Sequence, residues 1–128
     1  MALDINIKRT TDAQNHATLT VELGGSLDTA TAPELERQFT PALDASVRNL
    51  VFDLAKLTFI SSAGLRVFAV ARKFMNQQNE KVSFVHLQPQ IQEVFEIVKA
   101  LPGVSIFASL AEFDAYLAAR QRKVIEGN

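Results

Sequence analysis

The chain has 128 residues, 48% of them hydrophobic and 21% charged, which suits one domain with a single core and leaves no room for a second. Its 13 basic and 14 acidic residues give a formal net charge of −1, so its charge favours neither nucleic acid nor an anionic membrane as a partner. The absence of cysteine excludes disulfides, thiol catalysis and thiolate metal sites, and the lack of a signal-like or membrane-spanning apolar segment predicts a cytoplasmic protein.

The first two predicted elements are strands. Apolar and polar residues alternate in residues 3–7 and again in residues 19–23, which is the pattern of half-buried strands. The polar segment 9–15 between them predicts a hairpin with a loose loop. Gly24 and Gly25 are expected to end the second strand.

A helix is predicted after the loop at residues 26–32. Thr31 and Glu34 have the spacing of a capping box, which predicts that the helix opens there. Leu35 and the apolar residues after it share one face of this helix. Pro41 predicts a kink or a break near the end of the helix, because proline cannot continue it without strain.

The rest of the chain alternates between predicted strands and helices. The strands are expected at residues 50–54, 81–87 and 104–107, the first of them buried on both faces, and the helices at 62–77, at 91–98 before Pro102-Gly103, and from Ser109 with Glu112 as a second capping box. Residues 120–128 are polar and are expected to fray. This order predicts a single α/β domain over residues 1–128, with a mixed, mostly parallel sheet, an N-terminal hairpin strand and about four helices.

The segment FISSAGLRV, from Phe59 to Val67, lies where a strand pattern changes to a helix pattern. Ser61 can be the N-cap, and Ser62 lies where unpaired N–H groups and the helix dipole favour a negative group. A serine that only caps the helix is the simplest interpretation. Gly64 would allow a backbone or a phosphate to approach closely. Leu65 falls on the polar side of the predicted helix, either tucked under a loop or free to contact a partner.

Two sequences, FDLAKLTFISSAGLRV and GGSLDTATAP, resemble the signature of STAS domains, specifically that of bacterial anti-sigma factor antagonists. The resemblance extends over nearly the whole chain. In that family an anti-sigma factor that is also a kinase phosphorylates a serine at this junction, while the unphosphorylated antagonist binds the kinase and frees the sigma factor. The resemblance therefore implies an interaction protein that is not an enzyme. Phosphorylation of the serine would add negative charge to the binding surface of the antagonist and so switch its binding.

The resemblance also implies the residues and partners of the switch. Ser62 corresponds to the phosphoacceptor, with Ser61 as the alternative. The implied partner-binding residues are Asp28, Thr29, Ser61, Ala63, Gly64, Leu65 and Ala69. The implied partners are an anti-sigma factor and serine kinase of the histidine-kinase-like ATPase type and a phosphoserine phosphatase, with no nucleic acid, membrane, cofactor or metal. Ser61 and Ser26 stand where many members carry Asp and Glu, which implies a different partner specificity.

Two other functions fit parts of the sequence. Ser62, His86 and either Asp28 or Asp53 supply the residue types of a hydrolase triad, but Ile60 occupies the place of the first glycine in a nucleophile elbow. The second alternative is a STAS subunit of a transporter or of a sensory complex, acting without a phosphoswitch. No phosphate-binding glycine pattern is present, so nucleotide binding by the chain itself is not indicated.

Overall fold

A four-stranded mixed sheet forms the centre of the structure, a computed structural model that describes residues 2–100 and 109–127. The strands β1 (Leu3–Thr11), β2 (Ala17–Leu27), β3 (Val47–Ile60) and β4 (Val82–Val85) lie side by side in chain order. β1 pairs antiparallel with β2, whereas β2 with β3 and β3 with β4 are parallel pairs. The prediction of an N-terminal hairpin joined to a mostly parallel sheet is confirmed. The strand predicted at residues 104–107 and the helix end predicted at Pro102-Gly103 lie outside the described residues.

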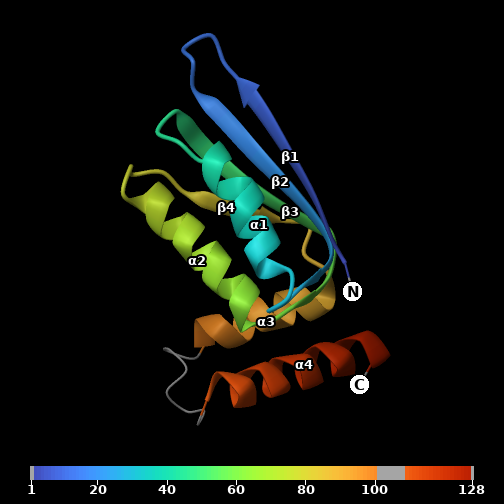
Figure 1. Ribbon diagram of the computed structural model, residues 1–128. Helices are drawn as coiled ribbons and strands as arrows, with labels where there is room; N and C mark the ends of the chain where they lie inside the picture. The colour runs from blue at the N-terminus through green and yellow to red at the C-terminus, as the bar shows by residue number, and fades with distance from the viewer. Residues whose placement is uncertain (1, 101–108, 128) are drawn as a thin grey trace.

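The described residues form four α-helices: α1 (Ala32–Phe39), α2 (Ser62–Asn76), α3 (Pro89–Ala100) and α4 (Leu110–Glu126). Figure 1 shows α1 and α2 on one face of the sheet, and α3 and α4 across the end of the sheet where β2 and β3 finish. The predicted α/β class and number of helices are confirmed. The start of α2 thus meets the C-terminal helices at one end of the molecule.

Buried and partly exposed residues alternate along β3, which shows that helices cover one face of the sheet. In β3, Leu50, Phe52 and Leu54 are buried, while Val51 and Asp53 between them are partly exposed. The prediction that residues 50–54 are buried on both faces is therefore wrong, because described helices cover only one face of this strand. Parallel strands with a single covered face keep the alternating pattern that antiparallel sheets usually show.

Phe52 joins the two helices to the sheet. Its ring centroid lies 5.8 Å from that of Phe39 in α1, 4.7 Å from that of Phe68 in α2 and 5.4 Å from that of Phe84 in β4. Aromatic pairs at these separations add roughly 0.5–1.5 kcal/mol each beyond the burial of their area. This cluster therefore fixes α2 against the sheet.

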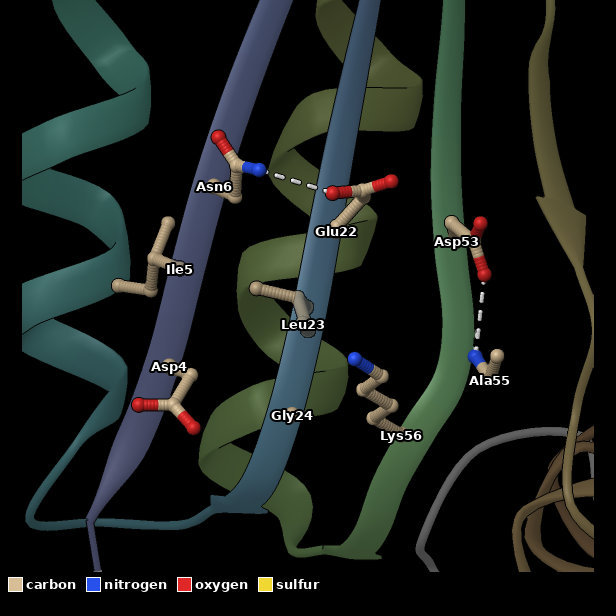
Figure 2. Close-up of a pocket in the computed structure, with 9 residues that line it drawn as sticks. All are labelled: Asp4, Ile5, Asn6, Glu22, Leu23, Gly24, Asp53, Ala55 and Lys56. Carbon is tan, nitrogen blue, oxygen red and sulfur yellow. Dashed lines mark hydrogen bonds between the residues drawn. The ribbon is translucent and has the colours of Figure 1, made fainter.

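The opposite face of the sheet is polar and holds a shallow pocket, shown in Figure 2 with α2 behind the strands. Asn6 Nδ2 donates to Glu22 Oε1 at 2.9 Å, and Lys8 Nζ lies 3.2 Å from Glu22 Oε2. The Ala55 N–H donates to Asp53 Oδ1 at 3.1 Å. These groups satisfy one another, so this face behaves as a solvated surface.

Two glycines do not end β2, contrary to the prediction. The strand continues to Leu27, with changes of register against β3 near Gly24 and Gly25. Gly25 has a φ of +91°, and a Cβ there would lie 2.3 Å from the Ala2 carbonyl oxygen. Only glycine adopts this conformation without strain, so the pair allows the strand to bend and continue.

The helix ends differ in part from their predictions. α1 stops at Phe39 and a 3₁₀ turn follows at Thr40–Ala42, which confirms the break near Pro41. Ser109 caps α4 as predicted, since its Oγ accepts from the Glu112 N–H at 3.1 Å. The prediction that residues 120–128 fray is wrong for the described part, because α4 continues through Glu126.

Candidate functional site

The ends of β2 and β3 bring the Asp28 loop beside the start of α2. Leu27 pairs with Ile60 in the sheet, and the Ser61 N–H donates to the Leu27 carbonyl at 2.9 Å. The two segments that carry the family resemblance are therefore held together by the backbone of neighbouring parallel strands. Functional groups of α/β proteins commonly gather at such strand ends.

Asp28 turns its carboxylate into its own loop. Its Oδ1 accepts from the Ala30 N–H at 3.0 Å and from the Thr31 N–H at 3.1 Å. Thr31 does not cap α1 with its side chain; its hydroxyl donates instead to the Ser26 carbonyl at 2.8 Å. The helix therefore begins after Thr31, as predicted, but the side-chain bond of a capping box is absent, because the Thr31 hydroxyl donates to Ser26 and Asp28 orders the turn before α1.

Ser61 occupies the N-cap position of α2 but does not cap with its side chain. Its backbone is extended, with φ −110° and ψ 179°, as an N-cap requires. The residue is only 5% exposed, and its Oγ has no hydrogen-bond partner among the described residues. The cap is supplied by another part of the chain.

Asp114, on α4, supplies this cap and holds Ser62. The Ser62 N–H donates to Asp114 Oδ1 at 2.7 Å, and the Ser62 hydroxyl donates to Asp114 Oδ2 at 2.8 Å. A carboxylate at a helix N-terminus is stabilised by the free N–H groups and by the helix dipole. Sequence reasoning missed Asp114, since one aspartate on an amphipathic helix 52 residues away looks like a solvated side chain.

A buried glutamine attaches α4 to the end of β3. Gln121 Oε1 accepts from the Ile60 N–H at 2.9 Å, and its Nε2 donates to the Ile60 carbonyl at 2.8 Å. The residue is 1% exposed. Nearby, Arg120 Nη2 lies 3.2 Å from Glu93 Oε2 on α3. The second half of α4 is thus anchored independently of Asp114.

Gly64 lies in the first turn of α2 and is buried against the ends of β2 and β3. A Cβ at this position would lie 2.6 Å from Leu27 Cγ and 2.9 Å from Ile60 Cγ1. Such distances are far inside van der Waals contact, so glycine is required for α2 to pack on the strand ends. The close neighbours of Gly64 are side chains of the core, and its part in the site is to shape it.

An open groove of about 660 Å³ runs between α2 and α4 beside Ser62. Leu65 and Ala69 line it from α2, and Leu110 and Asp114 line it from α4. The remaining lining residues are Thr29, Ala63, Arg66, Val98, Ala111 and Phe113. A second groove on the other side of Leu65 and Ala69 extends toward Phe84 and Phe95. Leu65 is half-buried and also packs against the core, so it has both the structural and the surface position that the sequence left open.

The family model of the STAS domain matches residues 5–113. The chain belongs to the STAS family. It is 39% identical over 75 residues to BtrV of Bordetella bronchiseptica, whose name describes an anti-sigma factor antagonist; the match covers 59% of this chain and 65% of BtrV, just under two thirds of that relative. It is 30% identical over 95 residues to the anti-sigma-B factor antagonist of Staphylococcus aureus, which covers 74% of this chain and 85% of the relative.

The structure of the anti-sigma factor antagonist SpoIIAA in its unphosphorylated form is similar, with a TM-score of 0.59 and 16% identity over 73% of this chain and 83% of SpoIIAA. Its phosphorylated form, described as a Bacillus cell fate determinant, gives a TM-score of 0.57 over 73% of this chain and 82% of SpoIIAA. At this level of identity the likeness concerns the fold. The predicted STAS fold is thereby confirmed.

Within the STAS frame, α4 is the less expected part of the site. The family match ends at residue 113, and Asp114 is the first residue beyond it. The contacts of Asp114 with Ser62 and of Gln121 with Ile60 therefore come from a segment outside the matched region. The STAS signature predicted that the strand ends and the start of α2 lie together. It did not predict that α4 packs over them.

The residues of the hydrolase alternative do not form a triad. His86 Nδ1 lies 3.1 Å from Asp53 Oδ1, whereas the Ser62 hydroxyl pairs with Asp114. Asp53 precedes Ile60 by seven residues of extended strand, about 23 Å. Partial burial raises the pKa of Asp53, but the hydrogen bond from the Ala55 N–H and the interaction with His86 outweigh it, so the net shift is downward. Asp53 thus accepts from nearby donors, away from the serine.

Within residues 2–100 and 109–127, no three His, Asp or Glu side chains gather in a way that could hold a metal ion. None of the helices in the same ranges combines the length and apolar character required to cross a membrane.

Proposed function

We propose that this protein is an anti-sigma factor antagonist of the bacterial cytoplasm. In its unphosphorylated form it binds an anti-sigma factor that is also a serine kinase of the histidine-kinase-like ATPase type, and the sigma factor is freed. Phosphorylation of Ser62 ends this binding, and a phosphoserine phosphatase restores it. The names of the two relatives and the STAS family support the class of function. The protein acts by binding and turns over no substrate.

The observation that carries the proposal is the difference between the two serines. The Ser62 side chain lies on the groove and is partly exposed, whereas Ser61 is 5% exposed and its hydroxyl is buried. A kinase must place the acceptor oxygen in line with the γ-phosphate, so an exposed hydroxyl is a far better substrate than a buried one. This difference favours Ser62 over Ser61 as the phosphoacceptor.

The surface beside Ser62 suits a protein partner. Leu65 and the exposed Ala69 form an apolar ridge between two grooves, with Ala63 and Thr29 at the same end. Interfaces commonly bury a small apolar centre within a polar rim. Placing Ser62 at the edge of this ridge puts the modification where it would contact the partner.

Phosphorylation would weaken such a contact through charge. Phosphoserine carries about −1.5 to −2 charges at neutral pH. An unpaired charge buried at an interface costs roughly 2–5 kcal/mol of binding. This corresponds to a loss of affinity of roughly thirty-fold to several thousand-fold.

Affinity purification from the native host tests the proposal. Wild-type protein should retain a histidine-kinase-like ATPase, and Ser62→Asp should not. The recovered kinase with ATP should then label wild-type protein and Ser61→Ala, and leave Ser62→Ala unlabelled. Retention of a membrane transporter without a kinase, or phosphate mapped to Ser61, would contradict the proposal.

A further inference from the structure

We propose that Asp114 is a latch that holds the first turns of α4 on Ser62, and that phosphorylation of Ser62 opens it. This inference rests on the proposed function, because it concerns the effect of the same modification. It adds a conformational consequence: the first turns of α4 would loosen when the phosphate is added, and the wall that they form beside the groove would become less ordered.

The contacts explain why the latch closes on the unmodified serine. Both oxygens of Asp114 are used, one by the Ser62 N–H at 2.7 Å and one by the Ser62 hydroxyl at 2.8 Å. Each bond joins a neutral donor to an ionised acceptor, the stronger class of hydrogen bond. The carboxylate also benefits from the positive end of the α2 dipole.

Phosphoryl transfer removes one of these bonds and adds repulsion. The bond between the γ-phosphorus and its bridging oxygen in ATP breaks, a bond forms from that phosphorus to Ser62 Oγ, ADP leaves, and the hydroxyl proton is released. Ser62 Oγ then has no hydrogen to donate to Asp114. The new phosphate brings about two negative charges next to a carboxylate, in the place where the carboxylate now caps the helix.

Positively polarised groups close to Ser62 would bind the phosphate more favourably than the Asp114 carboxylate would. It is drawn to the free N–H groups at the start of α2, where anions bind readily. Arg66 lies one helical turn further along α2 and lines the same groove, and its guanidinium forms no hydrogen bond or ion pair within the described ranges. An arginine four residues after a phosphoserine can pair with it on one helix face. The phosphate would therefore displace Asp114 from the helix start.

The anchors of α4 define which part moves. Gln121 and Arg120 hold its second half to the Ile60 backbone and to Glu93, through contacts that do not involve Ser62 itself. Its first half carries Asp114 and the 59% exposed Leu110 and lines the groove beside Leu65, while its Phe113 side chain, 5% exposed, packs in the core. Opening the latch removes the polar contact of this half and leaves the packing of Phe113, so residues 110–116 should open more often while residues 118–124 keep their protection. The docking surface would then change in shape as well as in charge.

Hydrogen–deuterium exchange tests the latch without any natural kinase. Phosphoserine is introduced at position 62 during translation, and exchange in the full chain is compared with that of unmodified protein. Amides of residues 113–116 should exchange about tenfold faster or more in the phosphoprotein, while those of residues 118–124 stay within about twofold. The isosteric Asp114→Asn variant is the matched control, because its amide oxygen still accepts from the Ser62 N–H and its NH₂ group can donate to phosphate. In that variant the phosphate-induced increase should fall below about threefold.

Equal exchange in the two wild-type forms would overturn the latch. So would an equal phosphate-induced increase in Asp114→Asn, since charge would then not be the cause, and so would a uniform loss of protection that includes β2 and β3. These results do not depend on a partner. A closed latch together with kinase labelling of Ser62 would reject this inference and leave the proposed function standing. An open latch in the phosphoprotein, with no labelling of Ser62 by the kinase, would reject the proposed function and leave the latch standing.

Discussion

Asp114 and Ser62 are 52 residues apart in the chain, and the carboxylate of one receives both the backbone N–H and the hydroxyl of the other. The pair joins the last helix to the junction that defines the STAS signature. In most proteins the residue at the N-cap supplies the acceptor at a helix start. Here the N-cap residue Ser61 makes no capping bond with its side chain, and the Asp114 carboxylate accepts from the helix start instead.

The Asp114 contact is expected to contribute to stability. Asp114→Ala removes the acceptor for two part-buried donors of Ser62 and should lower the free energy of unfolding by roughly 1–3 kcal/mol. Asp114→Asn keeps the acceptor for the N–H and should cost less than half as much. Urea unfolding of both variants measures the difference. Wild-type stability in Asp114→Ala would mean that the contact contributes nothing.

Gly64→Ala is expected to destabilise the fold through overpacking. The new methyl group would overlap Leu27 and Ile60, and such insertions cost roughly 1–3 kcal/mol. The loss occurs even though alanine is the better helix former. Ala69→Ser on the exposed side of the same helix is the control and should change the free energy of unfolding by less than about 0.5 kcal/mol. Thermal melts that show Gly64→Ala at or above wild-type stability would contradict the packing role.

Features that depend on interactions between residues close in the chain were predictable from the sequence, and those that depend on distant residues were not. Alternation in β1 and β2 is local, so the hairpin was predictable. The break at Pro41 follows from one residue's covalent geometry. By contrast, the polar residues of the last helix suggested a fraying tail. Gln121 is buried only because its amide fits the paired N–H and C=O of Ile60, a relation that one sequence does not reveal.

The same limit applied to the site. The STAS signature placed Asp28 and Ser62 in neighbouring segments, and the sheet register brings those segments together. It did not indicate that Asp28 is occupied by its own loop, because an aspartate in a polar loop reads equally well as a contact residue or as a turn former. Asp114 carried no signal at all, since its partner is on another helix.

Ala69→Arg is expected to weaken partner binding strongly without affecting the fold. Ala69 is exposed on the ridge between the two grooves, so a long charged side chain there should meet the partner but nothing in the free protein. We expect affinity to fall at least about thirtyfold, equivalent to roughly 2 kcal/mol, with an unchanged melting temperature. Leu65→Ala, by comparison, should lose both affinity and some stability, because Leu65 also packs against the core. Calorimetric titration of the purified kinase measures the affinities, and undiminished binding by Ala69→Arg would remove this ridge from the interface.

Asp28 is expected to act through its loop. Asp28→Asn keeps an oxygen that can accept from the Ala30 and Thr31 N–H groups, so the fold should be retained, whereas Asp28→Ala should lose about 1 kcal/mol of stability. If the negative charge itself contacts the partner, Asp28→Asn should alter binding or the rate of Ser62 phosphorylation. Normal binding and normal phosphorylation by a folded Asp28→Asn variant would limit Asp28 to a structural role.

Ser61→Ala separates the two serines most cleanly. The Ser61 hydroxyl is buried without a partner among the described residues, and a buried polar group left unpaired costs free energy. Removing it should leave stability unchanged or raise it by up to about 1 kcal/mol, because the extended backbone and the Asp114 cap remain. The variant should also accept phosphate at Ser62 at close to the wild-type rate. Denaturant unfolding and phosphopeptide mapping test the two halves of this prediction. A clear loss of stability would show that the Ser61 hydroxyl has a partner outside the described residues, and a loss of labelling with the fold intact would make Ser61, rather than Ser62, the acceptor.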